Sequence, residues 1–393
     1  MPRWVDTFEE FAVDVILERR YGKRAAMLRL LLRGLSRIYE PLVQARLGLF
    51  RQRFFRSHQL GIPVISVGNL TVGGTGKTPV VERLARELRD GGRRVAILSR
   101  GYKSRRPPLL RRWFGRRIEG PRIVSTGEGP LLDSATSGDE PFMLAKNLPG
   151  VAVFVDKNRV KSGLHAIRTW GADVILLDDG MQYQRLQHRI DVVLVDRLAP
   201  FGNDCLLPRG TLREPPRNLR RARYILITKS RPGASNLELI ERIREYNRTA
   251  EIIECRHRPV HLENLRTGEH LPLSSLEGKF YGAMSGIATP ESFENSLRDL
   301  GALLEVTARF ADHHRFTAKE IKSFSERCIR RDVDAILTTE KDAVRIPAVE
   351  TGEMPIYFLR VEIEILSGHP HWEHFIRRLC EPQPLVRAEK LYG

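Results

Sequence analysis

Residues 65–78 read ISVGNLTVGGTGKT, an apolar run that leads into a glycine-rich segment ending in Gly-Lys-Thr. Glycines let backbone N–H groups curl around phosphate oxygens, and the N-terminus of a following helix adds a favourable dipole. This pattern predicts a P-loop, in which Lys77 reaches the β- and γ-phosphates of a nucleotide and Thr78 binds Mg²⁺. The predicted phosphate-binding residues are Thr71, Val72, Gly73, Gly74, Thr75, Gly76, Lys77 and Thr78.

The first position of this loop departs from the strict P-loop pattern. That pattern has glycine five positions before Gly76, where this chain has Thr71. A chance glycine-rich turn is therefore the alternative interpretation. The apolar strand before the loop, and the helical pattern of Val81, Leu84 and Leu88 after it, favour the P-loop.

Short apolar runs rich in Val and Ile alternate with helical stretches from residue 62 onward, which is typical of βαβ units. Such continuously apolar strands indicate a sheet that is covered on both faces. The sequence therefore predicts an α/β fold of the P-loop NTPase type, with a mostly parallel sheet and helices on both faces. The predicted strands are residues 62–67, 94–98, 151–155, 174–177, 192–195, 224–228 and 251–254.

The pattern changes after the last of these strands. Residues 256–273 are polar and rich in turn residues, including Arg266-Thr267-Gly268, and predict a hairpin linker. A second, smaller α/β pattern follows, with strands near residues 280–284 and 335–338. We expect three parts: a basic amphipathic region at residues 1–60, a P-loop domain at 61–255, and a C-terminal α/β domain with its linker and tail at 256–393.

The chain is strongly basic and lacks the pattern of a membrane span. It has 393 residues, with 65 Lys and Arg against 48 Asp and Glu, which gives a net charge of +17. Its longest apolar runs are far below the ~20 residues that a spanning helix needs. The first ten residues are partly acidic and have no signal-peptide core. Four separated cysteines without a CxxC pattern indicate neither disulfides nor a zinc cluster, so we expect a reducing cytosol.

More than half of the excess charge lies in residues 15–60, which contain 11 Arg or Lys and two acidic residues. Leucines recur here at helical spacing, with Arg29, Arg33 and Arg37 on another face, until Pro41 interrupts the pattern. A second stretch of Leu and Phe among arginines follows it. A basic amphipathic helix of this kind either docks on an anionic membrane or packs on its own domain, and composition favours neither.

Acidic residues follow the predicted strand at residues 174–177. P-loop enzymes hold Mg²⁺ with a carboxylate at such a strand end, and Asp178-Asp179-Gly180 fits this role. Asp196, which follows the strand at 192–195, is a competing candidate. The doubled carboxylate favours Asp178 and Asp179.

Two further clusters offer acid–base chemistry. Asp139 lies in a Ser-Gly-Asp-Glu-Pro turn, and Asp312 precedes His313 and His314. A hydroxyl group that attacks a γ-phosphate needs a proton acceptor, and an Asp oriented by a His can serve. By residue chemistry alone, a helix start and surface histidines are the more common explanations of these two clusters.

Two more segments bear on ligands. Residues 201–215 are rich in Gly and Pro without periodicity, and predict a long loop at the ligand edge of the sheet. Residues 103–122 form a basic insertion containing Trp113 and Phe114, which raises an alternative function, a P-loop ATPase or GTPase that binds nucleic acid. Because the Arg-rich region is amphipathic and no nucleic-acid-binding motif is present, we expect no nucleic acid as a partner.

The ordered set of motifs resembles the tetraacyldisaccharide 4′-kinase family, the lipid A 4′-kinases of Gram-negative bacteria. The resemblance covers roughly residues 25–366, and such a set is far more specific than any single motif. A threonine at the first loop position is normal in this family. The motifs are VGNLTVGGTGKTP (67–79), SRGY (99–102), GDEP (138–141), DDGMQ (178–182), FGN (201–203), LLPRG (206–210), LREP (212–215), ADH (311–313) and TTEKDAV (338–344).

The resemblance implies an enzyme that transfers the γ-phosphate of ATP, with Mg²⁺, to the 4′-hydroxyl of tetraacyldisaccharide 1-phosphate, forming lipid IVA. By matching motif, Asp139 is the catalytic base and His313 its partner, and Glu214 completes a metal site near Asp178 and Asp179. The N-terminal helix would dock on the cytoplasmic face of the inner membrane, where the acylated substrate resides. No obligate protein partner is evident. The insertion at residues 103–122 is longer and more basic than is usual in the family, and the tail after Glu381 has no counterpart that we identify there.

Overall fold

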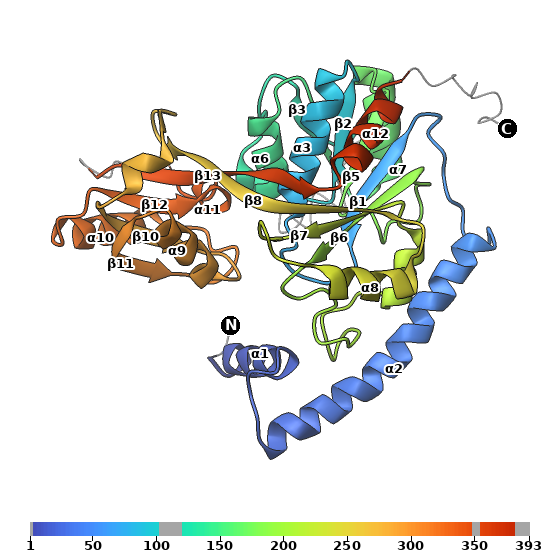
Figure 1. The fold of residues 1–393 in the computed structure, drawn as a ribbon, viewed down its shortest axis with the longest axis horizontal. Helices are drawn as coiled ribbons and strands as arrows, with labels where there is room; N and C mark the ends of the chain where they lie inside the picture. The colour runs from blue at the N-terminus through green and yellow to red at the C-terminus, as the bar shows by residue number, and fades with distance from the viewer. Residues whose placement is uncertain (1–2, 102–119, 348–353, 382–393) are drawn as a thin grey trace, which may run out of the picture.

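The computed structural model describes residues 3–101, 120–347 and 354–381, with side chains from residue 10 onward. Most of the basic insertion at residues 103–122 and the tail after Glu381 lie outside these ranges, so what we expect of them stays a prediction. The described chain forms a large curled sheet flanked by helices, with two N-terminal helices set along one side (Figure 1).

The sheet has 13 strands and is mostly parallel. In order across it lie β11 (Leu303–Arg309), β10 (Phe280–Ser285), β12 (Ala335–Thr339), β13 (Ile356–Ser367), β8 (Glu251–Asn264), β7 (Tyr224–Thr228), β6 (Ile190–Asp196), β1 (Val64–Asn69), β5 (Val174–Asp178), β2 (Val95–Ser99), β4 (Ala152–Val155) and β3 (Arg122–Thr126), and β9 (His270–Leu271) pairs with β8. The antiparallel pairs are β13 with β8, β3 with β4, and β8 with β9. This arrangement confirms the predicted fold class.

Helices cover both faces of the P-loop half of the sheet, because side chains along each strand alternate between two cores. In β6, Val192 and Leu194 belong to one core, whereas Val193 and Val195 belong to the other. The first core is completed by α3 (Lys77–Asp90), α6 (Asp139–Asn147) and α12 (His369–Cys380). The opposite face is covered by α7 (Arg159–His165), η1 (Ala166–Trp170), η2 (Pro216–Arg221) and α8 (Leu237–Tyr246).

The remaining strands build a second part around β10 and β12. Its two cores involve α9 (Pro290–Asp299), α10 (Ala318–Ile329) and η3 (Leu273–Leu276), and the short helices α5 (Ser134–Ser137) and α11 (Glu340–Ala343) lie at its junction with the P-loop part. The last helix, α12, returns to the P-loop part, where Trp372, Phe375 and Leu379 join the first core. The sequence division near residue 256 stays a prediction.

The predicted linker at residues 256–273 is wrong in its first half, because β8 continues through it to Asn264. The strand is polar because both of its faces are only partly covered and its charged residues pair across to β13, as in Arg256 Nε to Glu364 Oε2 at 2.5 Å. The turn at Arg266-Thr267-Gly268 does separate two antiparallel strands, β8 and β9. Strands β8 and β13 run side by side through both parts of the molecule (Figure 1).

The N-terminal region forms α1 (Arg3–Ile16) and α2 (Lys23–Arg51). Pro41 does not interrupt α2 as predicted, although an interior proline costs about 3 kcal/mol. Contacts on both sides of Pro41 offset this cost. Before it, Ser36 Oγ donates to the carbonyl oxygen of Leu206 at 2.7 Å; after it, Arg46 donates to the carbonyl oxygen of Gln182 at 3.2 Å.

The helix α2 turns a mixed side with Ala25, Ser36 and Leu47 toward the protein, and carries an apolar stripe outward. Ser36 is buried, whereas six apolar side chains along α2 are 45–73% exposed: Met27, Leu30, Leu31, Leu35, Ile38 and Leu42. Among the described residues, no helix is both long enough and apolar enough to cross a membrane.

Candidate active site

The glycine-rich loop joins the buried strand β1 to the first turn of α3, as the P-loop pattern predicts. Gly73 and Gly76 have φ angles of 111° and 79°, a region that favours glycine. A Cβ atom on Gly76 would lie 2.4 Å from Cε1 of His257 on β8, so the ring of His257 would have to move to admit any other residue here. A hydrogen bond also fixes the loop at Thr75, because Thr228 Oγ1 donates to the carbonyl oxygen of Thr75 at 3.0 Å.

A cavity of about 400 Å³ lies against this loop, within the size range of small-molecule sites. Asp196 lies at its wall, where Lys229 Nζ approaches Asp196 Oδ2 at 2.5 Å. Asp196, the competing candidate for the strand-end carboxylate, is thus part of the wall of this cavity. The other lining residues come from three places: the end of α1 and the segment after it, the glycine-rich loop, and residues 199–211. They are Ile16, Leu17, Glu18, Thr71, Val72, Gly73, Gly74, Thr75, Ala199, Gly202, Asn203 and Thr211.

Lys77 and the acidic pair meet beside the loop. The Nζ atom of Lys77 donates to Asn69 Oδ1 at 3.1 Å and lies 3.8 Å from Asp179 Oδ1. Asp179, with a φ angle of 52°, accepts two hydrogen bonds of 2.9 Å from the guanidinium of Arg213. Burial alone would raise the pKa of Asp179, but these hydrogen bonds and the charges of Lys77 and Arg213 lower it below its usual value.

Asp178 differs from Asp179, because it is buried and no arginine forms an ion pair with its carboxylate among the described residues. Burial, reinforced by the charges of Glu140 and Asp179, raises the pKa of Asp178 to about 7. Ser99 Oγ donates to Asp178 Oδ2 at 3.1 Å, whereas the buried Oδ1 has no hydrogen-bond partner among the described residues. A carboxylate with a free buried oxygen, close to two other carboxylates, fits a divalent cation with oxygen ligands such as Mg²⁺. Thr78, in the first turn of α3, adds a hydroxyl group near Lys77.

Glu214, the remaining predicted metal ligand, has partners of its own. Its buried carboxylate accepts hydrogen bonds from Asn218 Nδ2 at 2.7 Å and from Arg221 at 2.9 Å, both on η2. Its role as a metal ligand stays a prediction. The carboxylates whose charges raise the pKa of Asp178 are those of Glu140 and Asp179.

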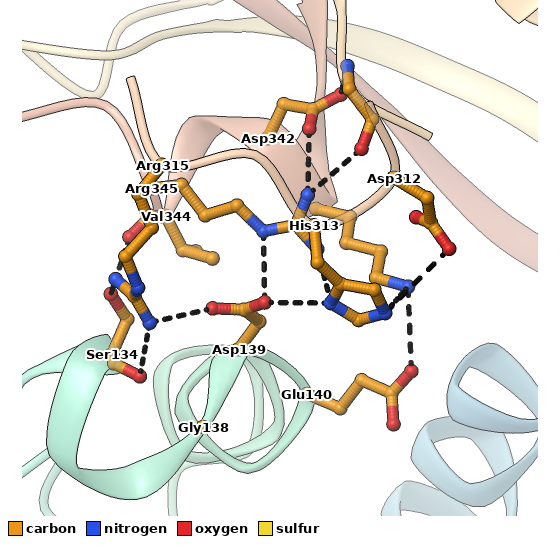
Figure 2. Close-up of polar contacts among 12 residues, drawn as sticks. Ser134, Gly138, Asp139, Glu140, Asp312, His313, Arg315, Asp342, Val344 and Arg345 are labelled. Atoms are coloured by element: carbon orange, nitrogen blue, oxygen red, sulfur yellow. Dashed lines mark hydrogen bonds and ion pairs between the residues drawn. The ribbon is translucent and has the colours of Figure 1, made fainter. Parts of the chain in front are cut away.

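Asp139 and His313 lie in contact although 174 positions separate them in the chain (Figure 2). Asp139 begins α6, and its Oδ2 lies 3.2 Å from Nδ1 of His313. His313 follows β11 in a turn with a φ angle of 66°. His314 points elsewhere: its Nε2 lies 3.1 Å from both carboxylate oxygens of Glu320, and its ring stacks on Phe310.

Two arginines hold Asp139 in place. Arg345, whose side chain is fully buried, donates from Nε to Asp139 Oδ2 at 2.8 Å, and Arg315 donates to Oδ1 at 3.2 Å. Burial would raise the pKa of Asp139, but the hydrogen bond with His313 and the charges of Arg345 and Arg315 lower it. Asp139 is therefore a carboxylate at neutral pH, oriented by three cationic or polar groups.

Lys341 connects the Asp139–His313 pair to the acidic region. Its Nζ lies 3.4 Å from His313 Nε2 and 3.7 Å from Glu140 Oε1. Glu140 in turn acts on the pKa of Asp178, beside Lys77. Glu140 thus joins the aspartate–histidine pair to the carboxylates beside the P-loop lysine in one polar region. Figure 2 shows the part of this region that contains Asp139, Glu140 and His313.

A buried ion network fixes α3 to the second part, next to Lys341. Arg360 on β13 donates to Glu82 on α3, and to Glu340 Oε1 at 2.6 Å. Asn147, the last residue of α6, also donates to both glutamates, at 3.2 and 2.6 Å. Because buried ion pairs are costly to break, this network stabilises the relative positions of α3, α6 and α11.

Sequence reasoning did not assign several residues of this region. Arg213 and Lys341 lie inside quoted motifs but received no role, and Glu140 was read only as part of a turn. Arg345 lies one residue beyond the motif at 338–344. Basic residues one to three positions from a predicted acidic or histidine motif are the signal that could have found Arg345 and Arg315.

Comparisons with known proteins identify the family of this chain. The family model described as tetraacyldisaccharide-1-P 4′-kinase matches residues 28–381. The tetraacyldisaccharide 4′-kinase of Anaeromyxobacter dehalogenans (strain 2CP-C) is 40% identical over 326 residues, which are 81% of this chain and 82% of the relative. That of Syntrophus aciditrophicus (strain SB) is 36% identical over 361 residues, which are 90% and 93% of the two chains.

A solved structure has the same fold. It is described as the "apo" form of LpxK from Aquifex aeolicus in complex with ATP, and it is 30% identical to this chain with a TM-score of 0.70. The similarity covers 90% of this chain and 99% of that one. On the family model, the curated relatives and this structure together, the chain belongs to the tetraacyldisaccharide-1-phosphate 4′-kinase family.

Proposed function

We propose that this protein transfers the γ-phosphate of ATP to the 4′-hydroxyl of tetraacyldisaccharide 1-phosphate, which forms lipid IVA in lipid A biosynthesis. The observation that carries the proposal is the continuous polar region in which Lys77, Asp178 and Asp139 lie, linked through Glu140 and Lys341. Phosphoryl transfer requires a phosphate cradle and a proton acceptor at one site. The alternative of a nucleic-acid-binding ATPase is not favoured by family membership.

On this proposal the P-loop half binds the nucleotide. The backbone of residues 71–76 and the ammonium of Lys77 hold the β- and γ-phosphates, and the adjoining cavity of about 400 Å³ accepts the rest of ATP. Thr78, Asp178 and Asp179 would hold Mg²⁺, which supplies charge neutralisation at the phosphate oxygens. Arg213 keeps the Asp179 carboxylate oriented.

Asp139 and His313 take the proton of the sugar hydroxyl. The hydroxyl oxygen forms the new bond to the γ-phosphorus while ADP leaves, and the hydroxyl proton passes to this pair. The low pKa of Asp139 keeps it ionised, so that it accepts a hydrogen bond from the hydroxyl or from His313 at neutral pH. Arg345 and Arg315 are positioning residues, since they bind Asp139 rather than the reacting atoms.

The activity is tested directly with purified protein, labelled ATP, Mg²⁺ and tetraacyldisaccharide 1-phosphate. We expect a new labelled lipid with one more phosphate than the acceptor. The control acceptor lacks a free 4′-hydroxyl and should give no labelled lipid. ATP hydrolysis without any labelled lipid, while the acceptor remains unchanged, would contradict the proposed reaction.

We further propose that α2 docks the protein on the cytoplasmic face of the inner membrane, where the lipid substrate is found. The support is the outward apolar side of α2, with Leu30 at 73% and Ile38 at 60% exposed, next to exposed Arg33 and Arg37. Apolar side chains and arginines on one exposed helix are typical of interfacial helices. A helix that served only to pack on its own domain would turn these apolar side chains inward, whereas on α2 they face outward.

The docking surface predicts a loss of vesicle binding in a triple variant, Leu31→Gln, Ile38→Gln and Leu42→Gln. Because each buried apolar side chain contributes at least about 1.5 kcal/mol, partitioning onto anionic vesicles should fall by more than about 100-fold. Neutralising Arg29, Arg33 and Arg37 together should also weaken binding, most strongly at low salt. Recovery with phosphatidylglycerol vesicles in a flotation assay measures both effects.

The matched control is a triple variant elsewhere, Phe280→Gln, Leu303→Gln and Ile329→Gln. These side chains are similarly exposed, at 48%, 45% and 55%, but lie in the second part of the molecule. We expect normal flotation for the control. Equal recovery of both triple variants would overturn the assignment of α2 as the docking helix.

A further inference from the structure

Three potential metal ligands lie together on the β8–β9 hairpin, outside the active site. His261 and Glu263 are two positions apart on β8, so both side chains point to the same face of the strand. His270 lies directly opposite Glu263 in the register of β9 with β8. The hairpin therefore places two imidazoles and a carboxylate on one surface.

The donor atoms of these side chains are close to one another. One ligand atom from each of the three residues lies within 4.8 Å of the other two. The two imidazole rings stack with centroids 4.0 Å apart, and His270 Nε2 lies 3.8 Å from Glu263 Oε2. A bound metal with ligand distances near ~2.1 Å requires donor atoms ~3.4 Å apart. Rotation of the His270 side chain, which is 59% exposed, can supply the difference.

Two features leave this group open to a ligand. The Nε2 atom of His261 is buried and has no hydrogen-bond partner in the part of the chain that the structure describes. Glu263 is held through its other oxygen, since Lys146 Nζ lies 2.8 Å from Oε1. An ion pair on Oε1 orients the carboxylate while Oε2 faces His270, as partners behind metal ligands commonly do.

We propose that His261, Glu263 and His270 bind one Zn²⁺ ion on the surface of the hairpin. Two imidazoles and one carboxylate are ligands that zinc prefers, and they leave a fourth position for water. Mg²⁺ favours all-oxygen sites, so the ion proposed for Asp178 and Asp179 would not compete here.

The proposed zinc site connects to the active site through α6. Lys146, which bonds to Glu263, lies in the last turn of the same helix that Asp139 begins. Asp139 and Lys146 are seven positions apart, which is about 10 Å along the helix.

The test measures zinc binding to the full-length, untagged protein in excess Mg²⁺, which occupies the oxygen-rich site. We expect one equivalent of Zn²⁺ after equilibrium dialysis, and a Co²⁺ substitution that gives the visible absorption of a low-coordinate site. His261→Ala and His270→Ala should each weaken Zn²⁺ affinity by at least about tenfold. His374→Ala, an exposed histidine on α12, is the matched control and should bind as the unaltered protein does.

A second measurement covers the case in which a variant is less stable. Zn²⁺ should raise the Tm of the unaltered protein and of His374→Ala, because a ligand that binds the folded state stabilises it. The same addition should leave the Tm of His261→Ala and His270→Ala unchanged, whatever their starting values. Absence of stoichiometric zinc, or equal zinc binding by all four proteins, would overturn the proposed site without bearing on the kinase reaction.

Discussion

Replacing Asp139 by alanine should lower the turnover number for lipid phosphorylation by about 10²–10⁴-fold, the usual contribution of a general base. The variant retains Lys77 and the loop that holds the phosphates, so its affinity for ATP should be nearly unchanged. Turnover is measured with saturating ATP and acceptor, and ATP affinity by equilibrium binding. The acid–base role of Asp139 therefore predicts a loss in kcat without a loss in nucleotide binding.

The structure also dictates the controls for this variant. Alanine leaves Arg345 buried without the carboxylate that it bonds at 2.8 Å, so the variant should have a lower Tm. Asp139→Asn keeps the size of the side chain and should also lose turnover, since an amide cannot take a proton. Asp299→Ala, on the exposed side of α9, should leave turnover unchanged.

His313→Ala extends the same prediction. If Asp139 and His313 act as a pair, the double variant should be little slower than either single variant, because groups that act as a unit are not additive. Multiplying effects in the double variant, or ordinary turnover in Asp139→Asn, would show that the pair does not share the proton.

The second large effect is expected at Lys77. Replacing it by alanine should lower kcat/KM by about 10²–10³-fold, the usual cost of removing one preorganised donor at developing charge. Its ammonium lies between Asn69 and Asp179, with the side chain only 17% exposed. Lys77→Arg should not restore activity, because the planar fork of arginine cannot replace a compact ammonium in this position.

Lys77→Ala is checked by initial rates over a range of ATP concentrations. Lys322→Ala, at an exposed position on α10, is the matched control and should behave as the unaltered protein. Asp179 keeps its two hydrogen bonds from Arg213 when Lys77 is removed, so the Tm of the variant should change by only a few degrees. A normal kcat/KM in the folded Lys77→Ala variant would remove Lys77 from the catalytic groups.

The P-loop half of the fold could be predicted because its information is local. Strands β1, β2, β4, β5, β6 and β7 are short apolar runs, and the glycine-rich loop has a conformation that few other residues adopt. Strand β8 beyond Glu254 and strand β13 were not predicted. In both strands apolar residues alternate with charged ones, and Arg256 on β8 pairs with Glu364 on β13. In the sequence alone, such a segment looks like a polar linker. Pro41 was misjudged for a related reason, since the contacts that hold α2 come from residues distant in the sequence, Gln182 and residues 206–218.

The residues of the site also differ in whether a local sequence pattern could predict them. Lys77 and the Asp178–Asp179 pair follow from strand ends that parallel strands bring to one edge of the sheet. Asp139 and His313 were assigned only through the family resemblance, since no local pattern joins residues 174 positions apart. The roles of Arg345 and Arg213 depend on where loops meet, and the sequence does not contain that information in a readable form.

The return of α12 to the P-loop part also bears on how the protein is synthesised. Trp372, Phe375 and Leu379 complete the core that α3 shares with β1, β2, β5 and α6, so one side of this core stays open until the last described helix leaves the ribosome. At about 10 residues per second, the nascent chain spends roughly 30 s between emergence of α3 and of α12. During translation, the core of the nucleotide-binding half therefore remains incomplete until the last part of the chain is made.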